Sequence, residues 1–87
     1  MSVIGGQIDQ LDQLGVSFTR RSGEVEDLLS ALRGELSSAY WKGGAADRFR
    51  SAWDSEYEPA LRNLSAALVD ASDEIKSRAR ALESAGG

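Results

Sequence analysis

The sequence predicts an all-α fold, an antiparallel helix-turn-helix hairpin that pairs with a second hairpin into a four-helix bundle dimer. Apolar residues recur with helical spacing in two long stretches, one on each side of the middle of the 87-residue chain. The pattern stops only between Ser37 and Gly44, where two adjacent glycines supply backbone freedom. A connection this short forces two long helices to lie side by side and antiparallel. Residues 1–87 are therefore predicted to form a single hairpin domain.

The first helix is predicted over about residues 4–38. Its apolar positions follow coiled-coil spacing, and Gly15 and Ser22 occupy the two positions at which the apolar residue is skipped. Leu14 and Leu28 fall beside this seam, so the apolar stripe is wide enough to contact more than one neighbouring helix. The residues expected to pack in the core or in the dimer are Ile8, Leu11, Leu14, Phe18, Val25, Leu28, Leu29, Leu32 and Leu36.

The turn is predicted over residues 39–44 and contains Tyr40, Trp41, Gly43 and Gly44. A large aromatic residue needs burial, and here it stands close to glycine, which frees the backbone to bring it inward. We expect Tyr40 and Trp41 to pack over the end of the bundle, with Trp41 against the first turn of the second helix near Phe49.

The second helix is predicted over about residues 45–83, followed by a frayed tail at 84–87. Pro59 lies inside this helix and removes one backbone hydrogen bond, at a cost of about 3 kcal/mol. Because the apolar phase continues across Pro59 without a slip, a kink is expected rather than a break. The residues expected in the core or in the dimer are Phe49, Trp53, Tyr57, Leu61, Leu64, Leu68 and Ile75. Two interpretations, close helix approach or simple helix formation, are open for Ala52, Ala60, Ala67 and Ala71.

The composition argues against catalysis and against a cofactor. The chain has no histidine and no cysteine, so it lacks the usual general base, the commonest metal ligand and any disulfide. Groups of carboxylates such as Asp54, Glu56 and Glu58 lie within a helical pattern, where neighbours point in different directions. A solvated face is therefore the better interpretation than a cation site. We expect no catalytic residue, no metal and no cofactor.

The charge pattern and the N-terminal sequence exclude other partners. The formal charge is −4 and both signs are interspersed, which argues against nucleic-acid binding. No apolar run approaches the ~20 residues that span a bilayer, so stable membrane insertion is not expected. The N-terminus has no basic region followed by an apolar one, which predicts synthesis in the cytoplasm without a cleavable signal peptide.

Trp41 and Gly43 lie near mid-chain in the only break between two helical patterns, and the run from Gly44 to Trp53 follows with small residues and then aromatic ones. With these residues, and with the proline after Tyr57, the sequence resembles the WXG family over nearly its whole length. This family comprises small actinobacterial and firmicute hairpin proteins exported by type VII secretion systems, including the early secreted antigenic target proteins of mycobacteria. The resemblance implies a non-enzymatic, secreted or cell-surface protein that acts as a dimer with another WXG-like hairpin.

Many pairs in this family carry a signal, Tyr-x-x-x-Asp/Glu, just after the second helix of one partner. Here Tyr57 lies inside the helix and is followed four residues later by Leu61, so the signal is not carried over to any residue. The resemblance therefore implies the signal-less member of a heterodimer, which reaches the secretion ATPase through the tail signal of its partner. A homodimer is the competing assembly. The competing function is a non-secreted helical adaptor or a homodimeric chaperone-like module for a larger toxin or effector.

Overall fold

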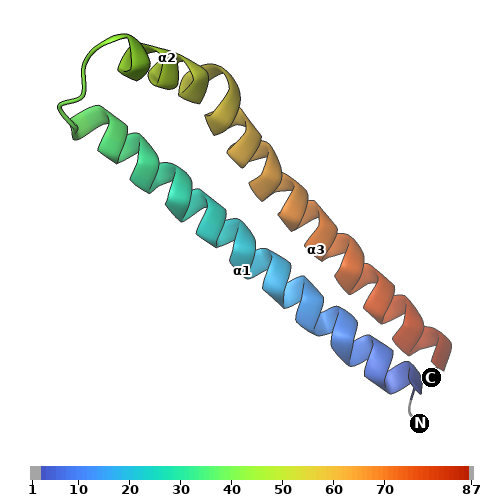
Figure 1. Cartoon of the computed structure of the whole chain (residues 1–87). Helices are drawn as coiled ribbons and strands as arrows, with labels where there is room; N and C mark the ends of the chain where they lie inside the picture. The colour runs from blue at the N-terminus through green and yellow to red at the C-terminus, as the bar shows by residue number, and fades with distance from the viewer. Residues whose placement is uncertain (1–2, 87) are drawn as a thin grey trace.

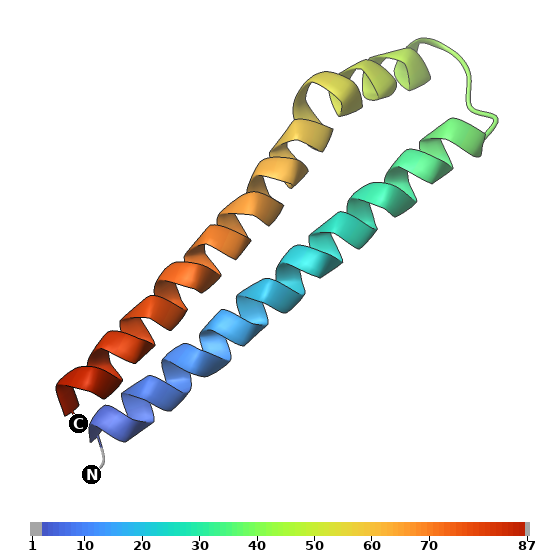
Figure 2. The same ribbon diagram turned by 180° about the vertical axis from the view of Figure 1, so that it is seen from behind.

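Two long helical arms make up the structure, a computed structural model that describes residues 3–86. The first arm is α1 (Val3–Ser38), and the second consists of α2 (Gly44–Ala52), the π-helical turn η1 (Trp53–Tyr57) and α3 (Glu58–Gly86). α1 and α3 run antiparallel, and the two ends of the described chain meet at the same end of the rod (Figure 1, and from behind in Figure 2). The rod measures 63 × 18 × 14 Å, so the predicted hairpin is present.

Both arms reach slightly beyond the predicted ranges. α1 begins at Val3, and Gly44, expected in the turn, is the first residue of α2. α3 continues to Gly86 instead of ending near Glu83, so the beginning of the tail is helical rather than frayed. Gly87, the last residue of the predicted tail, lies outside the described residues.

Small polar residues form the middle of the contact between α1 and α3. Ser22 and Ser65 are buried, and their hydroxyl oxygens lie 2.8 Å apart. Seven residues further along each arm, the buried Ser72 hydroxyl donates to the Gly15 carbonyl oxygen over 2.8 Å. A β-carbon on Gly15 would lie 3.3 Å from Cγ of Lys76, so glycine permits the close approach. The two residues that interrupt the apolar pattern in α1 therefore mark positions where the arms come close together.

Apolar side chains flank these serines but are only partly covered. Leu29 and Trp53 are buried, as are the small Ala46 and Ala79. The half-buried residues among those predicted for the core or the dimer are Ile8, Leu11, Phe18, Val25, Leu32, Leu36, Leu61, Leu68 and Ile75. The exposed residues of the same set are Leu14, Leu28, Phe49, Tyr57 and Leu64. A single chain thus covers only part of the apolar surface that the sequence provides.

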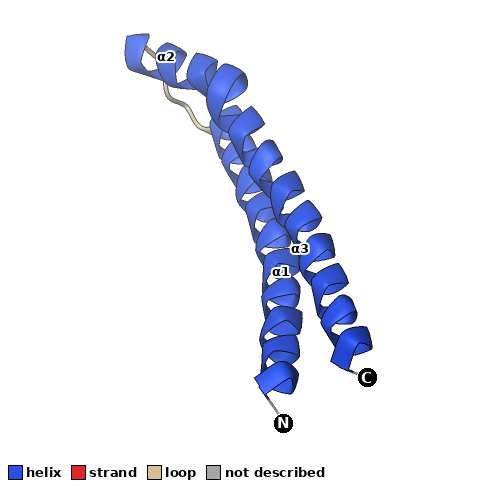
Figure 3. Ribbon diagram, turned by 90° about the vertical axis from the view of Figure 1, so that its right-hand side faces the viewer, coloured by secondary structure: helices blue, strands red, loops and turns tan. Residues whose placement is uncertain are grey.

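The second arm bends just before Pro59. A proline has no N–H, and its ring collides in an α-helix with the carbonyl group four residues earlier, here that of Ser55. The helix widens to a π turn over Trp53–Tyr57, and the Glu58 N–H donates to the Trp53 carbonyl oxygen, five residues earlier. Figure 3 shows α2 leaning away from the line of α3 beyond this turn. The second arm is therefore kinked and not broken, through a π turn that the apolar spacing does not reveal.

The two arms form a single layer of helices, which leaves each arm with a side that the other cannot cover. None of the helices described across residues 3–86 combines the length and apolarity needed to cross a membrane. The four-helix bundle requires a second hairpin and stays a prediction.

Candidate functional site

The arms are joined at residues 39–43 by a loop that only glycine allows to close in this form. The Ala39 N–H donates to the Glu35 carbonyl oxygen over 2.9 Å at the end of α1, and the Asp47 N–H donates to the Gly43 carbonyl oxygen over 3.0 Å at the start of α2. Gly43 has φ 113° and ψ 179°, a conformation that residues with a β-carbon rarely adopt. The backbone itself therefore requires the glycine of the Trp-x-Gly motif.

Trp41, Phe49 and Tyr57 form a line of partly exposed rings, here called the aromatic row. The ring centroids of Trp41 and Phe49 are 6.1 Å apart and those of Phe49 and Tyr57 are 5.7 Å apart, both within the range of favourable aromatic pairs. The predicted contact of Trp41 with Phe49 is therefore present. Tyr40 is 91% exposed, so it does not pack over the end of the single hairpin. Its packing over the end of the bundle stays a prediction.

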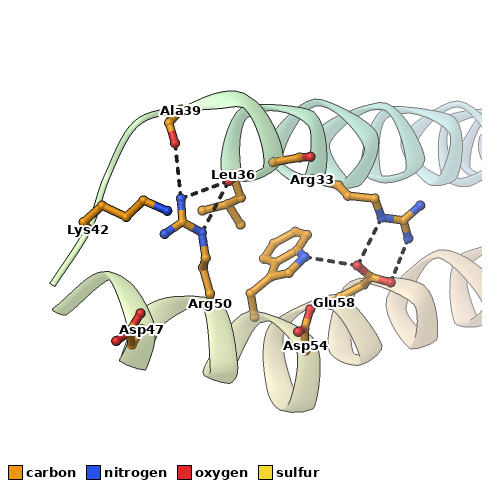
Figure 4. Close-up of a pocket in the computed structure, with 10 residues that line it drawn as sticks. Arg33, Leu36, Ala39, Lys42, Asp47, Arg50, Asp54 and Glu58 are labelled. Carbon is orange, nitrogen blue, oxygen red and sulfur yellow. Dashed lines mark hydrogen bonds and ion pairs between the residues drawn. The ribbon is translucent and has the colours of Figure 1, made fainter. Parts of the chain in front are cut away.

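Arg50 of α2 ties the loop to the end of α1. Its Nε and Nη2 donate to the Leu36 carbonyl oxygen over 3.3 and 3.0 Å, and Nη2 lies 3.4 Å from the Ala39 carbonyl oxygen. Its Nη1 donates to the Trp41 carbonyl oxygen over 2.6 Å. Figure 4 shows Arg50 reaching from α2 toward α1. These contacts were not predicted, because Arg50 and Leu36 are 14 residues apart and meet only after the chain has turned.

Glu58 accepts hydrogen bonds from Arg33, Arg62 and Trp53 at the kink. Figure 4 shows the bonds between Arg33 and Glu58. Arg33 of α1 donates from Nη2 to Oε2 over 2.7 Å and from Nε to Oε1 over 3.3 Å, and the buried Trp53 indole donates to Oε1 over 3.0 Å. The hydrogen bond from Arg33, followed by that from Arg62, lowers the pKa of the Glu58 carboxyl to about 2. The prediction of a solvated face is therefore wrong for Glu58, which joins the two arms.

A groove between the end of α1 and α2 carries both signs of charge (Figure 4). Its charged lining residues are Arg33, Lys42, Asp47, Arg50, Asp54 and Glu58. Arg33 is bound to Glu58 and Arg50 to backbone carbonyl groups, so these side chains hold the bend together. Among the residues described, no group of three His, Cys, Asp or Glu side chains is placed to hold a metal ion. The arrangement can support a recognition surface.

Four exposed side chains share one side of the hairpin, here called the apolar face. They are Leu14, Leu28, Tyr57 and Leu64. Leu14, Leu28 and Leu64 each directly precede a buried residue, namely Gly15, Leu29 and Ser65, respectively. Tyr57 directly precedes Glu58, which accepts a hydrogen bond from Arg33 of the other arm. In an antiparallel pair of helices, a twofold axis perpendicular to both helix axes relates the two arms. Residues that stand one position before a contact residue therefore point to the same side of the hairpin in both arms. Since Tyr57 also belongs to the aromatic row, the apolar face continues to Trp41 at the bend.

In a comparison with protein families, residues 4–86 match the WXG100 family, described as proteins of 100 residues with WXG. No curated protein and no solved structure matches the chain significantly. WXG100 proteins are small secreted helical proteins of the kind that type VII secretion systems export; they are not known as enzymes and typically pair with another WXG-like protein. The match includes both arms and the bend with Trp41 and Gly43, and the chain therefore belongs to the WXG100 family.

Proposed function

We propose that the chain is exported by a type VII secretion system as one half of a dimer of helical hairpins, without enzymatic activity. The observation that carries this proposal is the apolar face, which continues through Tyr57 and the aromatic row to the family motif at Trp41 and Gly43. A second hairpin fits this surface because another pair of long helices can cover it along its length.

The energetic argument rests on how little apolar surface a single chain buries. A leucine that passes from full exposure to full burial contributes about 1.5–3 kcal/mol. Leu14, Leu28 and Leu64 are 42%, 50% and 48% exposed, respectively. A partner that covers them would add roughly 1 kcal/mol for each leucine, before the aromatic row is included. Because serines occupy the middle of the contact between the arms, this gain favours the dimer as the folded form.

We propose a different WXG-like protein as the partner, and a tail signal on that partner as the contact with the secretion ATPase. Within the described residues, Tyr57 does not begin such a signal. It lies in the π turn and is followed four residues later by Leu61, where an acidic residue would complete a Tyr-x-x-x-Asp/Glu signal. A homodimer is the alternative assembly, in which two copies of the apolar face would meet around a twofold axis.

Charged substitutions on the apolar face test the pairing. Leu28→Asp and Leu64→Asp each place a carboxylate in the proposed interface, where burial without a partner is unfavourable. Ser30→Asp is the matched control, because Ser30 is exposed and follows Leu29, on the opposite side of α1. Sedimentation after co-expression with a small neighbouring gene product should show dimers for the wild type and the control, but monomers for the leucine variants. A well-folded wild-type monomer, both alone and after co-expression, would exclude the pairing.

Export is tested in strains with and without the secretion ATPase. We expect the protein in the medium only when the ATPase is present, and a several-fold smaller exported amount for Trp41→Ala. If deletion of the ATPase leaves the location of the protein unchanged, export is refuted. A non-secreted adaptor that docks its apolar face on a larger toxin or effector would then replace it.

A further inference from the structure

The C-terminal end of α1 needs hydrogen-bond donors that its own sequence does not supply. The last four carbonyl groups of an α-helix have no partner within the helix. A glycine just after the helix or a basic side chain in its last turn commonly satisfies them. Residues 35–38 contain no lysine or arginine, and the residue after Ser38 is Ala39. The Ala39 N–H satisfies the Glu35 carbonyl group, so the carbonyl groups that follow depend on donors from elsewhere.

We infer that Arg50 caps α1 from the other arm and, together with Phe49, positions Trp41. A guanidinium group presents five N–H donors in a rigid fork. Here the fork donates to the carbonyl oxygens of Leu36, in the last turn of α1, and of Ala39 and Trp41, in the loop, over 2.6–3.4 Å. One side chain of α2 thus holds the helix end and the loop together across the bend (Figure 4).

Trp41 is held by two consecutive residues of α2. Arg50 binds its carbonyl oxygen and lies 5.7 Å from its ring, and Phe49 lies 6.1 Å from the same ring. Because both contacts come from one helix, the orientation of α2 sets the position of Trp41. Loss of Arg50 would remove the hydrogen bond that holds the backbone of Trp41. The importance of this positioning for export rests on the proposed function, whereas the capping of α1 does not.

The positioning is measured by NMR on the folded protein, or on its co-purified complex with only this chain labelled with 15N. The indole N–H signals of Trp41 and Trp53 report separately on the bend and on the kink, since the Trp53 indole donates to Glu58. Arg50→Gln should shift the Trp41 signal and leave the Trp53 signal in place. Arg48→Gln, on the same helix with an exposed side chain, should shift neither signal.

Arg50→Lys provides a second variant that keeps the positive charge but not the fork. It should move the Trp41 signal in the same direction as Arg50→Gln by a smaller amount, and it decides the question if Arg50→Gln does not fold. An unchanged Trp41 signal in either folded variant would overturn the inference.

The export assay separates this inference from the proposed function. Both Trp41→Ala and Arg50→Gln should reduce export several-fold, while Arg48→Gln should not. If Trp41→Ala reduces export and Arg50→Gln does not, the positioning role is refuted and the proposed function stands. If Trp41→Ala leaves export unchanged, the proposed role of the bend fails, and the NMR result alone decides whether Arg50 positions Trp41.

Discussion

Replacing Ser22 and Ser65 with alanine, singly and together, measures how much the polar centre of the hairpin contributes to its stability. Both side chains are 6% exposed. Their hydroxyl oxygens are 2.8 Å apart, and the Ser22 hydroxyl also lies 3.1 Å from the Ser65 carbonyl oxygen. Either single substitution removes this pair and leaves the other hydroxyl buried with weaker partners.

The expected magnitudes follow from these contacts. A lost buried hydrogen bond costs about 1 kcal/mol net, and the hydroxyl left behind adds to that cost. The better helix propensity of alanine offsets a few tenths of a kcal/mol. Each single variant should therefore lose about 1 kcal/mol of unfolding free energy. The Ser22→Ala/Ser65→Ala double variant should also lose only about 1 kcal/mol, because no polar group is then left unpaired, which gives a coupling energy of about 1 kcal/mol.

The assay is urea unfolding followed by circular dichroism at one fixed protein concentration, because association changes the apparent stability. Exposed Ser30→Ala on the same helix is the control and should be neutral or slightly stabilising. Single-variant losses that add to the double-variant loss within about 0.3 kcal/mol would show that the two serines do not interact, and the reasoning would be refuted.

Three further predictions concern the kink and the glycines. Glu58→Gln should reduce the loss of stability in acid. The wild type should keep its unfolding free energy above about pH 4.5 and lose part of it as the pH falls toward the Glu58 pKa of about 2. Urea titrations that show the same loss in both proteins would contradict the ion-pair assignment. Gly43→Ala should lower the unfolding free energy by about 1–3 kcal/mol because Gly43 has a positive φ, whereas Gly44→Ala in α2 should have little effect. Equal unfolding midpoints for the two variants would exclude backbone strain at Gly43. The β-carbon of Gly23→Ala would meet open space, so this variant should stabilise the protein by about 0.5–1 kcal/mol. Gly15→Ala should stabilise it less, because its β-carbon would press on Lys76. Thermal unfolding that ranks the two variants in the reverse order would refute the close approach of the arms at Gly15.

The outline of the hairpin could be predicted because each step depends on neighbouring residues. Helical spacing of apolar residues defines both arms, and Gly43 marks the bend because its φ of 113° excludes most other residues. The register of α1 against α3 is also visible in the sequence, since Gly15 and Ser22 interrupt the apolar pattern at the positions where α3 comes close.

The contacts that hold the bend could not be predicted, because they join residues that are distant in the sequence and that meet only when the arms pair in one particular register. Arg33 and Glu58 are 25 residues apart, and their hydrogen bonds depend on the π turn that follows from strain at Pro59. Ala60 and Ala67 show a different limit of the pattern. Both are exposed, so within the hairpin they act as helix formers and the serines provide the close approach.

The antiparallel arrangement of the arms on either side of the bend also determines the order in which the contacts between them can form during folding. The contact of Leu36 with Arg50 closes a loop of 14 residues, whereas that of Gly15 with Ser72 closes one of 57 residues. Closing the longer loop first costs about 1 kcal/mol more in chain entropy, but once the bend has formed each later contact adds only a short segment. The contacts between the arms are therefore expected to form first at the bend and then successively toward the ends of the hairpin. Changes near Arg50 should then slow folding, while changes at the distant Ser72 should mainly speed unfolding.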